Sequence, residues 1–210
     1  MGIHDHLLEA HMNKKMLFSF VVVFLVGLII SPVYAEVRPW ELDQEHTNFY
    51  FSVDHIYAKV HGRFTDFKGI FLFDPDNLKD SHISIEIKAK SVDTGISKRD
   101  RHVVSEDFLD GSRYPLITFS SSSITKVGEN TYNVNGKLTI KGVTSDLILP
   151  LTYEGMKDHP LAPGMEVAGF NGRLTIDRLA YKVGDGKYYK MGAVDKDVDI
   201  LVTIEALRKK

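Results

Sequence analysis

The sequence contains no cysteine, and its charges nearly cancel, with 26 Lys and Arg against 28 Asp and Glu. The missing cysteines exclude disulfide bonds, thiolate nucleophiles and cysteine-ligated metal sites. The basic residues are scattered, so the clustered basic face on which nucleic-acid binding depends is also missing. A chain of 210 residues is long enough to bury an apolar core, and that core must provide the stability.

The sequence also lacks the motifs of common catalytic and metal sites. It has no Gly-x-Ser-x-Gly, no His-Glu-x-x-His and no paired histidine spacing that suits zinc. Asp74-Pro75-Asp76-Asn77 looks like the start of a calcium loop, but the later Gly and Glu are missing, so it predicts a turn. We therefore expect no metal, no cofactor and no enzymatic activity. A triad assembled by the fold alone would leave no such motif, however.

The first 35 residues have the order of a secretory leader. Met12-Asn13-Lys14-Lys15 is positively charged, Met16–Ile30 is uncharged and apolar, and the small residues Val33 and Ala35 follow. This order predicts a signal peptide over residues 12–35, cleaved after Ala35, and a periplasmic mature protein. A membrane anchor needs about 20 apolar residues, and Pro32 ends the run too early. The choice between Met1 and Met12 as the start stays open.

Beyond residue 35 the dominant hydrophobic period is two residues, which is typical of antiparallel strands with one buried face. Eight segments fit strands: Asn48–Asp54, Phe64–Phe73, His82–Lys90, Leu116–Ser123, Thr131–Lys141, Leu147–Tyr153, Val167–Asp177 and Asp197–Glu205. Turn residues separate them, so the pattern predicts a sandwich or a barrel. Closure into a barrel would remove exposed edges. We expect an all-β fold, an antiparallel barrel of about eight strands with one or two short helices.

One segment does not follow this period of two residues. Ser97–Leu109 has apolar residues at roughly helical spacing, with Ser97 as the expected cap and Gly111 as the expected end. It predicts a short helix beside one end of the barrel. Gly184-Asp185-Gly186 predicts a hairpin turn instead. No change in composition marks a second domain, so residues 36–210 are expected to form one domain.

The densest polar cluster lies on this predicted helix. It consists of Arg99-Asp100-Arg101-His102 followed by Glu106 and Asp107. Arginine suits bidentate recognition of phosphate, so the cluster could bind an anionic group or supply acid–base residues. The plainer interpretation, which we favour, is a set of ion pairs and caps that tie the helix to the rim of the barrel.

Several stretches in order are similar to one known family. They are Trp40–Thr47, Phe51–His55, Gly62–Gly69, Ser91–Gly95, Arg99–His102, Asp107-Phe108, Tyr114–Ser121 and Gly136–Thr144. From about Trp40 to Ala206 the chain resembles the YceI-like family, exported bacterial lipid-binding proteins with a lipocalin-like barrel. It departs from the family pattern after Asp177-Arg178, where Ala180-Tyr181 stands in place of a Phe-Gly. This change lies near the end of a predicted strand, so it affects the shape of the mouth of any pocket inside the barrel.

The resemblance implies a barrel that holds a polyisoprenoid or a similar amphiphile in an elongated apolar pocket. On apolarity alone, we expect these inward-facing residues to line it: Phe49, Phe51, Val53, Phe71, Phe73, Ile85, Ile87, Phe119, Val134, Leu138 and Ile140. Arg99 and His102 are candidates for contact with the head group. The ligand would be a lipid such as a quinone or a prenyl phosphate. We expect no nucleic-acid partner and, once the leader is cleaved, no membrane span.

Three functions stay open from the sequence. The first is a periplasmic carrier of such a lipid. The second is an enzyme that acts on the lipid through the cluster around Arg99–Asp107. The third is a stress-protective barrel with a filled core that binds a protein partner, since an eight-stranded barrel can either fill its interior or hold one ligand. The sequence does not identify the lipid, and it leaves open whether the protein forms a homodimer.

Overall fold

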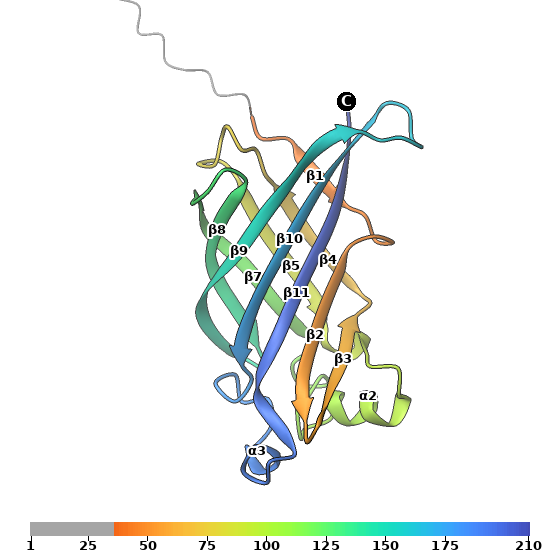
Figure 1. The fold of residues 1–210 in the computed structure, drawn as a ribbon, viewed down its shortest axis with the longest axis vertical. Coiled ribbons are helices and arrows are strands. Elements are labelled where there is room, and N and C mark those ends of the chain that lie inside the picture. Colours follow the sequence, from red (N-terminus) through yellow and green to blue (C-terminus); the bar gives the residue numbers. More distant parts are fainter. Residues whose placement is uncertain (1–35) are drawn as a thin grey trace, which may run out of the picture. The chain divides into compact units, whose positions relative to one another are not determined.

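The computed structural model describes residues 36–210, so the predicted leader and its cleavage after Ala35 lie outside the described residues. The described chain is almost entirely β-structure (Figure 1). The strands are β1 Pro39–Leu42, β2 Asn48–His55, β3 Ala58–Phe64, β4 Phe67–Leu72, β5 His82–Lys88, β6 Val92–Asp93, β7 Leu116–Lys126, β8 Thr131–Ile140, β9 Val143–Asp158, β10 Met165–Asp177 and β11 Val194–Lys209. The helices are η1 Ala89–Ser91, α2 Ser97–Val104 and α3 Lys187–Lys190.

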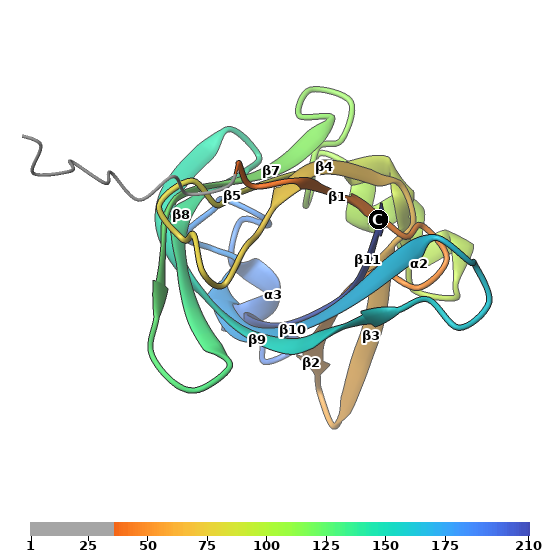
Figure 2. The ribbon, with the colours of Figure 1, turned by 90° about the horizontal axis from the view of Figure 1, so that it is seen from above.

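Eight of these strands close an antiparallel barrel, which confirms the expected fold class, but β1 replaces the predicted strand β2 in the ring. Their order is β1-β4-β5-β7-β8-β9-β10-β11, and β1 pairs with both β4 and β11. Figure 2 shows the ring from above. Closure removes the free edges that an open sheet would leave. Among residues 36–210, no helix is both long and apolar enough to cross a membrane.

The long strand β11 changes partner along its length. Its C-terminal part pairs with β1, through Leu207 opposite Glu41, whereas its N-terminal part pairs with β2, through Ile200 opposite Phe51. A turn between β1 and β2 allows this change. The β2–β3 hairpin continues the wall on one side, and β3 pairs with the short β6. The predicted strand Phe64–Phe73 is therefore split, because Thr65 and Asp66 separate β3 from β4.

One end of the barrel is filled by aromatic side chains. The Phe73 ring lies 5.1 Å from the Tyr132 ring, 5.4 Å from the Tyr153 ring and 5.1 Å from the Phe170 ring, between centroids. The Trp40 indole N–H donates to the Phe73 carbonyl at 3.1 Å. Edge-to-face pairs of this kind add about 0.5–1.5 kcal/mol each to the burial of the rings. This end of the barrel therefore has a packed interior.

The two short helices lie at the opposite end (Figure 1). Seen along the barrel, α3 projects within the ring of strands (Figure 2). The predicted helix at Ser97 exists as α2, but it ends at Val104, and Ile96 rather than Ser97 occupies the cap position, without a side-chain hydrogen bond. Gly184-Asp185-Gly186 lies in the long connection between the antiparallel strands β10 and β11, but it does not form a tight hairpin turn. Gly184 and Gly186 have φ of 87° and 83°, and Gly186 precedes the first turn of α3.

Candidate binding cavity

The barrel encloses a cavity of about 510 Å³ between its middle and the end that carries the helices. A volume of this size is within the range of small-molecule sites. The lining is apolar over most of its surface and comes from β2, β3, β4, β5, β7, β8, β9, β10 and β11. The cavity exists because inward positions on these strands carry Ile, Leu, Val and Phe, whose side chains leave the lumen unfilled at this level.

Most residues that the alternation predicted to face inward line this cavity. Nine of the eleven do so, namely Phe49, Phe51, Val53, Phe71, Ile85, Ile87, Phe119, Leu138 and Ile140. The other two, Phe73 and Val134, face inward but do not line it. Both are almost completely buried, at 2% and 0% exposure, and belong to the filled end. The barrel is therefore filled at one end and hollow at the other.

Solvent exposure shows where the cavity approaches the surface. Among its lining residues, Phe51, Val53 and Val60 on the β2–β3 hairpin are half-buried, whereas Leu151 near the filled end is completely buried. Met191, just after α3, lines the cavity and is 74% exposed. The mouth therefore lies between the β2–β3 hairpin, α2 and α3.

The polar cluster on α2 has a structural role at this mouth. Arg99 donates from Nε to the Thr94 hydroxyl at 2.8 Å and from Nη2 to the Thr94 carbonyl at 2.7 Å. The Asp100 carboxylate accepts from the Thr94 N–H at 2.8 Å and from its hydroxyl at 2.5 Å. These bonds tie α2 to the loop after β6, as the plainer interpretation expected. Arg99 also lines the cavity, and its guanidinium has five N–H donors, of which these bonds use two.

His102 lies in an aromatic group that joins the two helices across the mouth. Its Nε2 is 3.0 Å from the Asp107 carboxylate, and its ring lies 5.0 Å from that of Phe108 and 6.1 Å from that of Tyr188 on α3. All three rings line the cavity. The mouth is therefore covered by side chains from α2, α3 and the turn after α2 rather than by backbone.

Arg178 is a site residue that the sequence did not single out. It is 5% exposed, lines the cavity and donates to three backbone carbonyls, those of Asp195, Val183 and Val194, at 2.7, 2.7 and 3.1 Å. Burial lowers the pKa of its guanidinium, and this effect outweighs the nearby carboxylates, whose negative charges raise that pKa. These bonds tie the start of β11, at Val194 and Asp195, to the loop before α3 at Val183. They leave two of the five N–H donors for another acceptor.

No Asp or Glu is among the residues that line the cavity in the described chain. The polar lining consists of Tyr50, His55, Thr94, Arg99, His102, Arg178 and Tyr188. The mouth is thus a collection of hydrogen-bond donors with positive charge, and the interior is apolar. Such an arrangement can hold a long apolar chain with a polar or anionic head.

Asp43, His46 and Glu205 form a separate group outside the cavity, and their ligand atoms lie within 4.8 Å of one another. This group could hold a metal ion by residue type. The Asp43 carboxylate is already engaged, since it accepts from the Glu45 N–H at 2.8 Å and lies 2.8 Å from the His46 ring. These contacts form the turn between β1 and β2, which accounts for the group without an ion.

These features define the class of protein: a closed antiparallel barrel with an apolar cavity under two short helices. The YceI-like domain matches residues 40–206, most of the chain. A UPF0312 protein of Pseudomonas syringae pv. tomato is 32% identical over 195 residues, which cover 91% of this chain and 98% of that protein. The chain therefore belongs to the YceI-like domain family.

Solved structures agree with this assignment. BcnA of Burkholderia cenocepacia aligns with a TM-score of 0.69 and 28% identity over 80% of this chain and all of that one. A polyisoprenoid-binding domain from Saccharophagus degradans aligns with a TM-score of 0.60 over 80% of this chain and 97% of that one. Its identity is 16%, so this second likeness concerns the fold alone.

Proposed function

We propose that this chain is an exported carrier that holds a polyisoprenoid or a similar long amphiphile in the barrel. The observation that carries the proposal is the apolar cavity, which runs from the middle of the barrel to the helical end and has donors only at its mouth. Each methylene removed from water contributes about 0.8 kcal/mol. A long chain therefore needs no polar contact along its length to be held firmly.

Arg99, His102 and Arg178 would contact the head group. All three line the cavity near its mouth, and both arginines have N–H donors that make no hydrogen bond within residues 36–210. Guanidinium groups pair well with phosphate, and they also donate to neutral carbonyls. A prenyl phosphate or a quinone would each satisfy these donors. The isoprenoid class is supported by the structural neighbour from Saccharophagus degradans, a polyisoprenoid-binding domain.

A carrier fits the lining better than an enzyme does. Acid–base catalysis on the bound lipid would need a proton-transfer group in reach of the reacting bond, most often a histidine. His55 and His102 are the histidines that line the cavity, and the His102 ring is already engaged, since it lies 3.0 Å from the Asp107 carboxylate and packs against the Phe108 ring. The three acids of the predicted cluster, Asp100, Glu106 and Asp107, are not among the lining residues, and Asp100 is engaged by Thr94. The periplasmic location rests on the predicted signal peptide over residues 12–35.

A pair of variants on β9 tests the proposal. Leu147 lines the cavity, and its neighbour Ile148 points outward and is 54% exposed. Leu147→Asp places a charge in the apolar cavity, which is costly, so it should abolish binding of a polyprenyl phosphate or a quinone added to protein stripped of lipid. Ile148→Asp introduces the same charge on the outer face and should bind normally. Equal binding by both folded variants would contradict a lipid site in the barrel.

A further inference from the structure

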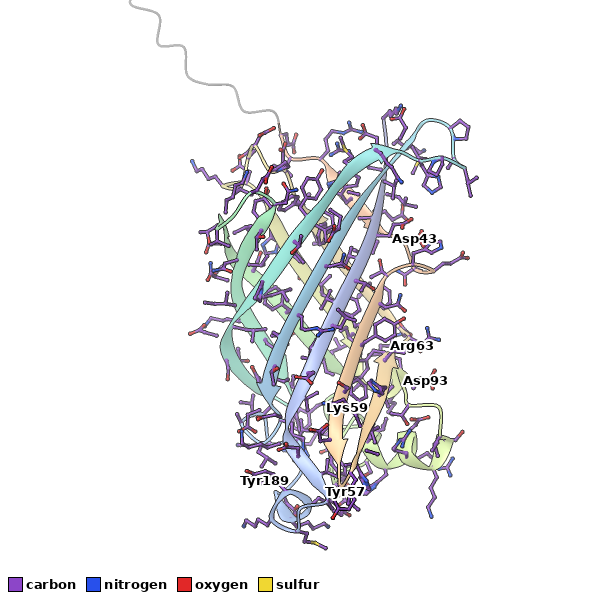
Figure 3. The ribbon with its side chains drawn as sticks, viewed as in Figure 1. Asp43, Tyr57, Lys59, Arg63, Asp93 and Tyr189 are labelled. Atoms are coloured by element: carbon purple, nitrogen blue, oxygen red, sulfur yellow. The ribbon has the colours of Figure 1, made fainter. Side chains whose placement is uncertain are left out.

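Large apolar side chains are exposed around the mouth of the barrel. Ile56 and Tyr57 form the turn of the β2–β3 hairpin, at 61% and about full exposure, and Met191 after α3 is 74% exposed. The Ile56 N–H donates to the Ala193 carbonyl at 3.1 Å, so this turn lies against the segment after α3. Figure 3 shows Tyr57 and Tyr189 at the same end of the molecule. Exposed apolar groups that gather at one place mark an interaction surface.

The residue types in this turn do not suit the turn itself. Two-residue hairpin turns favour Asn and Gly, because these residues tolerate positive φ. Ile56 has φ of 54°, a conformation that is strained for a β-branched residue. Its side chain is not buried in return, since it is 61% exposed. The residues of this turn therefore lower its local stability. Such a departure from the residues that suit the structure is expected at functional positions.

Basic residues surround these apolar tips. The helix α2 carries Lys98, Arg99 and Arg101 against Asp100, and the segment 182–191 carries Lys182, Lys187 and Lys190 against Asp185. The whole chain, by contrast, has more acidic than basic residues. Lys98, Arg101, Lys187 and Lys190 are exposed and have no ion pair with a carboxylate in residues 36–210. The same end also carries Asp54, which pairs with Lys59, and Asp107, which pairs with His102, as well as Glu106. The exposed basic residues of this end that make no described ion pair are therefore concentrated on α2 and α3 themselves.

From this juxtaposition we infer that the helical end of the barrel docks on an anionic lipid bilayer, with Ile56 and Tyr57 inserted and the lysines above the head groups. The inference rests on the proposed function, because a lipid carrier must bring its mouth to a membrane to load or unload. Exposed apolar side chains surrounded by basic residues are the combination that binds anionic membrane surfaces. Met191 lines the cavity at this same face, so a docked barrel would present its mouth to the lipid.

Vesicle co-sedimentation tests the inference. The full-length gene is expressed, and the exported protein is mixed with vesicles of phosphatidylcholine with or without phosphatidylglycerol. The wild type should sediment with the anionic vesicles and be released by high salt, which screens the lysines. Ile56→Asn combined with Tyr57→Ser should weaken sedimentation by roughly tenfold or more. In this turn only Ile56 has positive φ, which Asn tolerates, so the unfolding midpoint should stay unchanged or rise.

Two further variants separate the contributions. Lys187→Gln combined with Lys190→Gln should weaken binding to anionic vesicles by roughly tenfold and reduce its salt dependence. Leu161→Ser is the matched control, because Leu161 is 88% exposed in the loop between β9 and β10, at the opposite end of the barrel. It should leave sedimentation unchanged. Equal sedimentation of the wild type and the turn variant, or loss only in Leu161→Ser, would overturn the inference.

Mass spectrometry of the lipid bound to each variant keeps the two proposals distinct. Neither the turn nor Lys187 and Lys190 line the cavity, so these variants should still carry lipid if the function is right. Protein that carries lipid but ignores all vesicles would refute docking and leave the carrier function intact. Protein that binds anionic vesicles but carries no lipid would refute the function. Crosslinking of position 57 to a protein, with no vesicle binding, would assign this face to a protein partner and overturn the inference.

Discussion

The Phe108 ring stacks on the Tyr188 ring, with centroids 5.8 Å apart and planes at 12°. Phe108 follows α2 and Tyr188 belongs to α3, so this contact joins two segments that are 80 positions apart in the sequence. Both rings line the cavity. The stack is therefore a contact that must separate if a ligand passes between α2 and α3.

Tyr188→Ala should accelerate lipid exchange. Aromatic pairs contribute about 0.5–1.5 kcal/mol beyond burial, so a mouth held closed by this stack should release its ligand roughly 2- to 10-fold faster when the ring is removed. Release of a fluorescent prenyl probe from the wild type and the variant measures the rate. Tyr188→Phe keeps the ring and should release at the wild-type rate. Identical rates for all three proteins would show that the ligand leaves by another route.

Arg178→Lys should destabilise the fold. Three carbonyls accept from the Arg178 guanidinium in a site that is 5% exposed, and one ammonium group cannot reproduce this geometry. Carbonyls left without a donor cost about 1–3 kcal/mol each, so the free energy of unfolding should fall by about 2–4 kcal/mol in urea titration. Arg173→Lys, at an exposed arginine on β10, is the control and should be neutral. A neutral Arg178→Lys would contradict the anchoring role.

Phe73→Leu should lower stability and leave lipid content unchanged. Phe73 packs against three other rings at the filled end and does not line the cavity. Losing these ring contacts should cost about 1–3 kcal/mol, measured as a lower urea midpoint. Lipid extracted from the folded variant should match the wild type in amount. A parallel loss of lipid would mean that the ligand reaches further into the barrel than the cavity extends.

The turn at Asp43 and His46 should make stability depend on pH. Burial would raise the pKa of Asp43, but hydrogen bonds from the His46 ring and from backbone N–H groups outweigh it and lower that pKa. The hydrogen bond to Asp43 raises the pKa of His46. A raised histidine pKa stabilises the fold fully below the unfolded value of about 6.5, and this stability is lost as the pH rises through the folded value.

His46→Gln should remove that dependence. The thermal midpoint of the wild type should exceed that of the variant at about pH 5.5, where His46 is protonated, and the difference should shrink at about pH 9. His61→Gln, at an exposed histidine on β3 with no described ion pair in residues 36–210, controls for the loss of a histidine. A difference that is constant across this range would show that the ion pair makes no contribution.

The sequence predicted most of the long strands and the inner face of their residues, but it missed β1 and the depth of the cavity. A period of two assigns Phe71 and Phe73, or Leu138 and Val134, to the same inner face. It does not state at which height the lumen is filled. That depends on Tyr132, Tyr153 and Phe170, which come from three different strands and meet at Phe73 only in the closed barrel.

The mouth was the least predictable part. Arg178 stands in a stretch that the sequence marked only as the start of a departure from the family pattern, and its burial among three carbonyls reveals its role. The glycines at 184 and 186 suggested a hairpin because both tolerate positive φ, which a turn before a short helix also requires. Arg99 and His102 were found from sequence because they belong to a dense polar cluster. Their partners Thr94, Phe108 and Tyr188 emerge only from the fold.

The most direct test of the central claim is the content of the barrel itself. The protein is expressed from the full-length gene, purified and extracted with organic solvent, and the extract is identified and quantified by mass spectrometry. The account predicts an isoprenoid or a similar long amphiphile in stoichiometric amount, lost in Leu147→Asp and retained in Ile148→Asp. A protein that yields no lipid and also ignores added prenyl phosphates and quinones would contradict it.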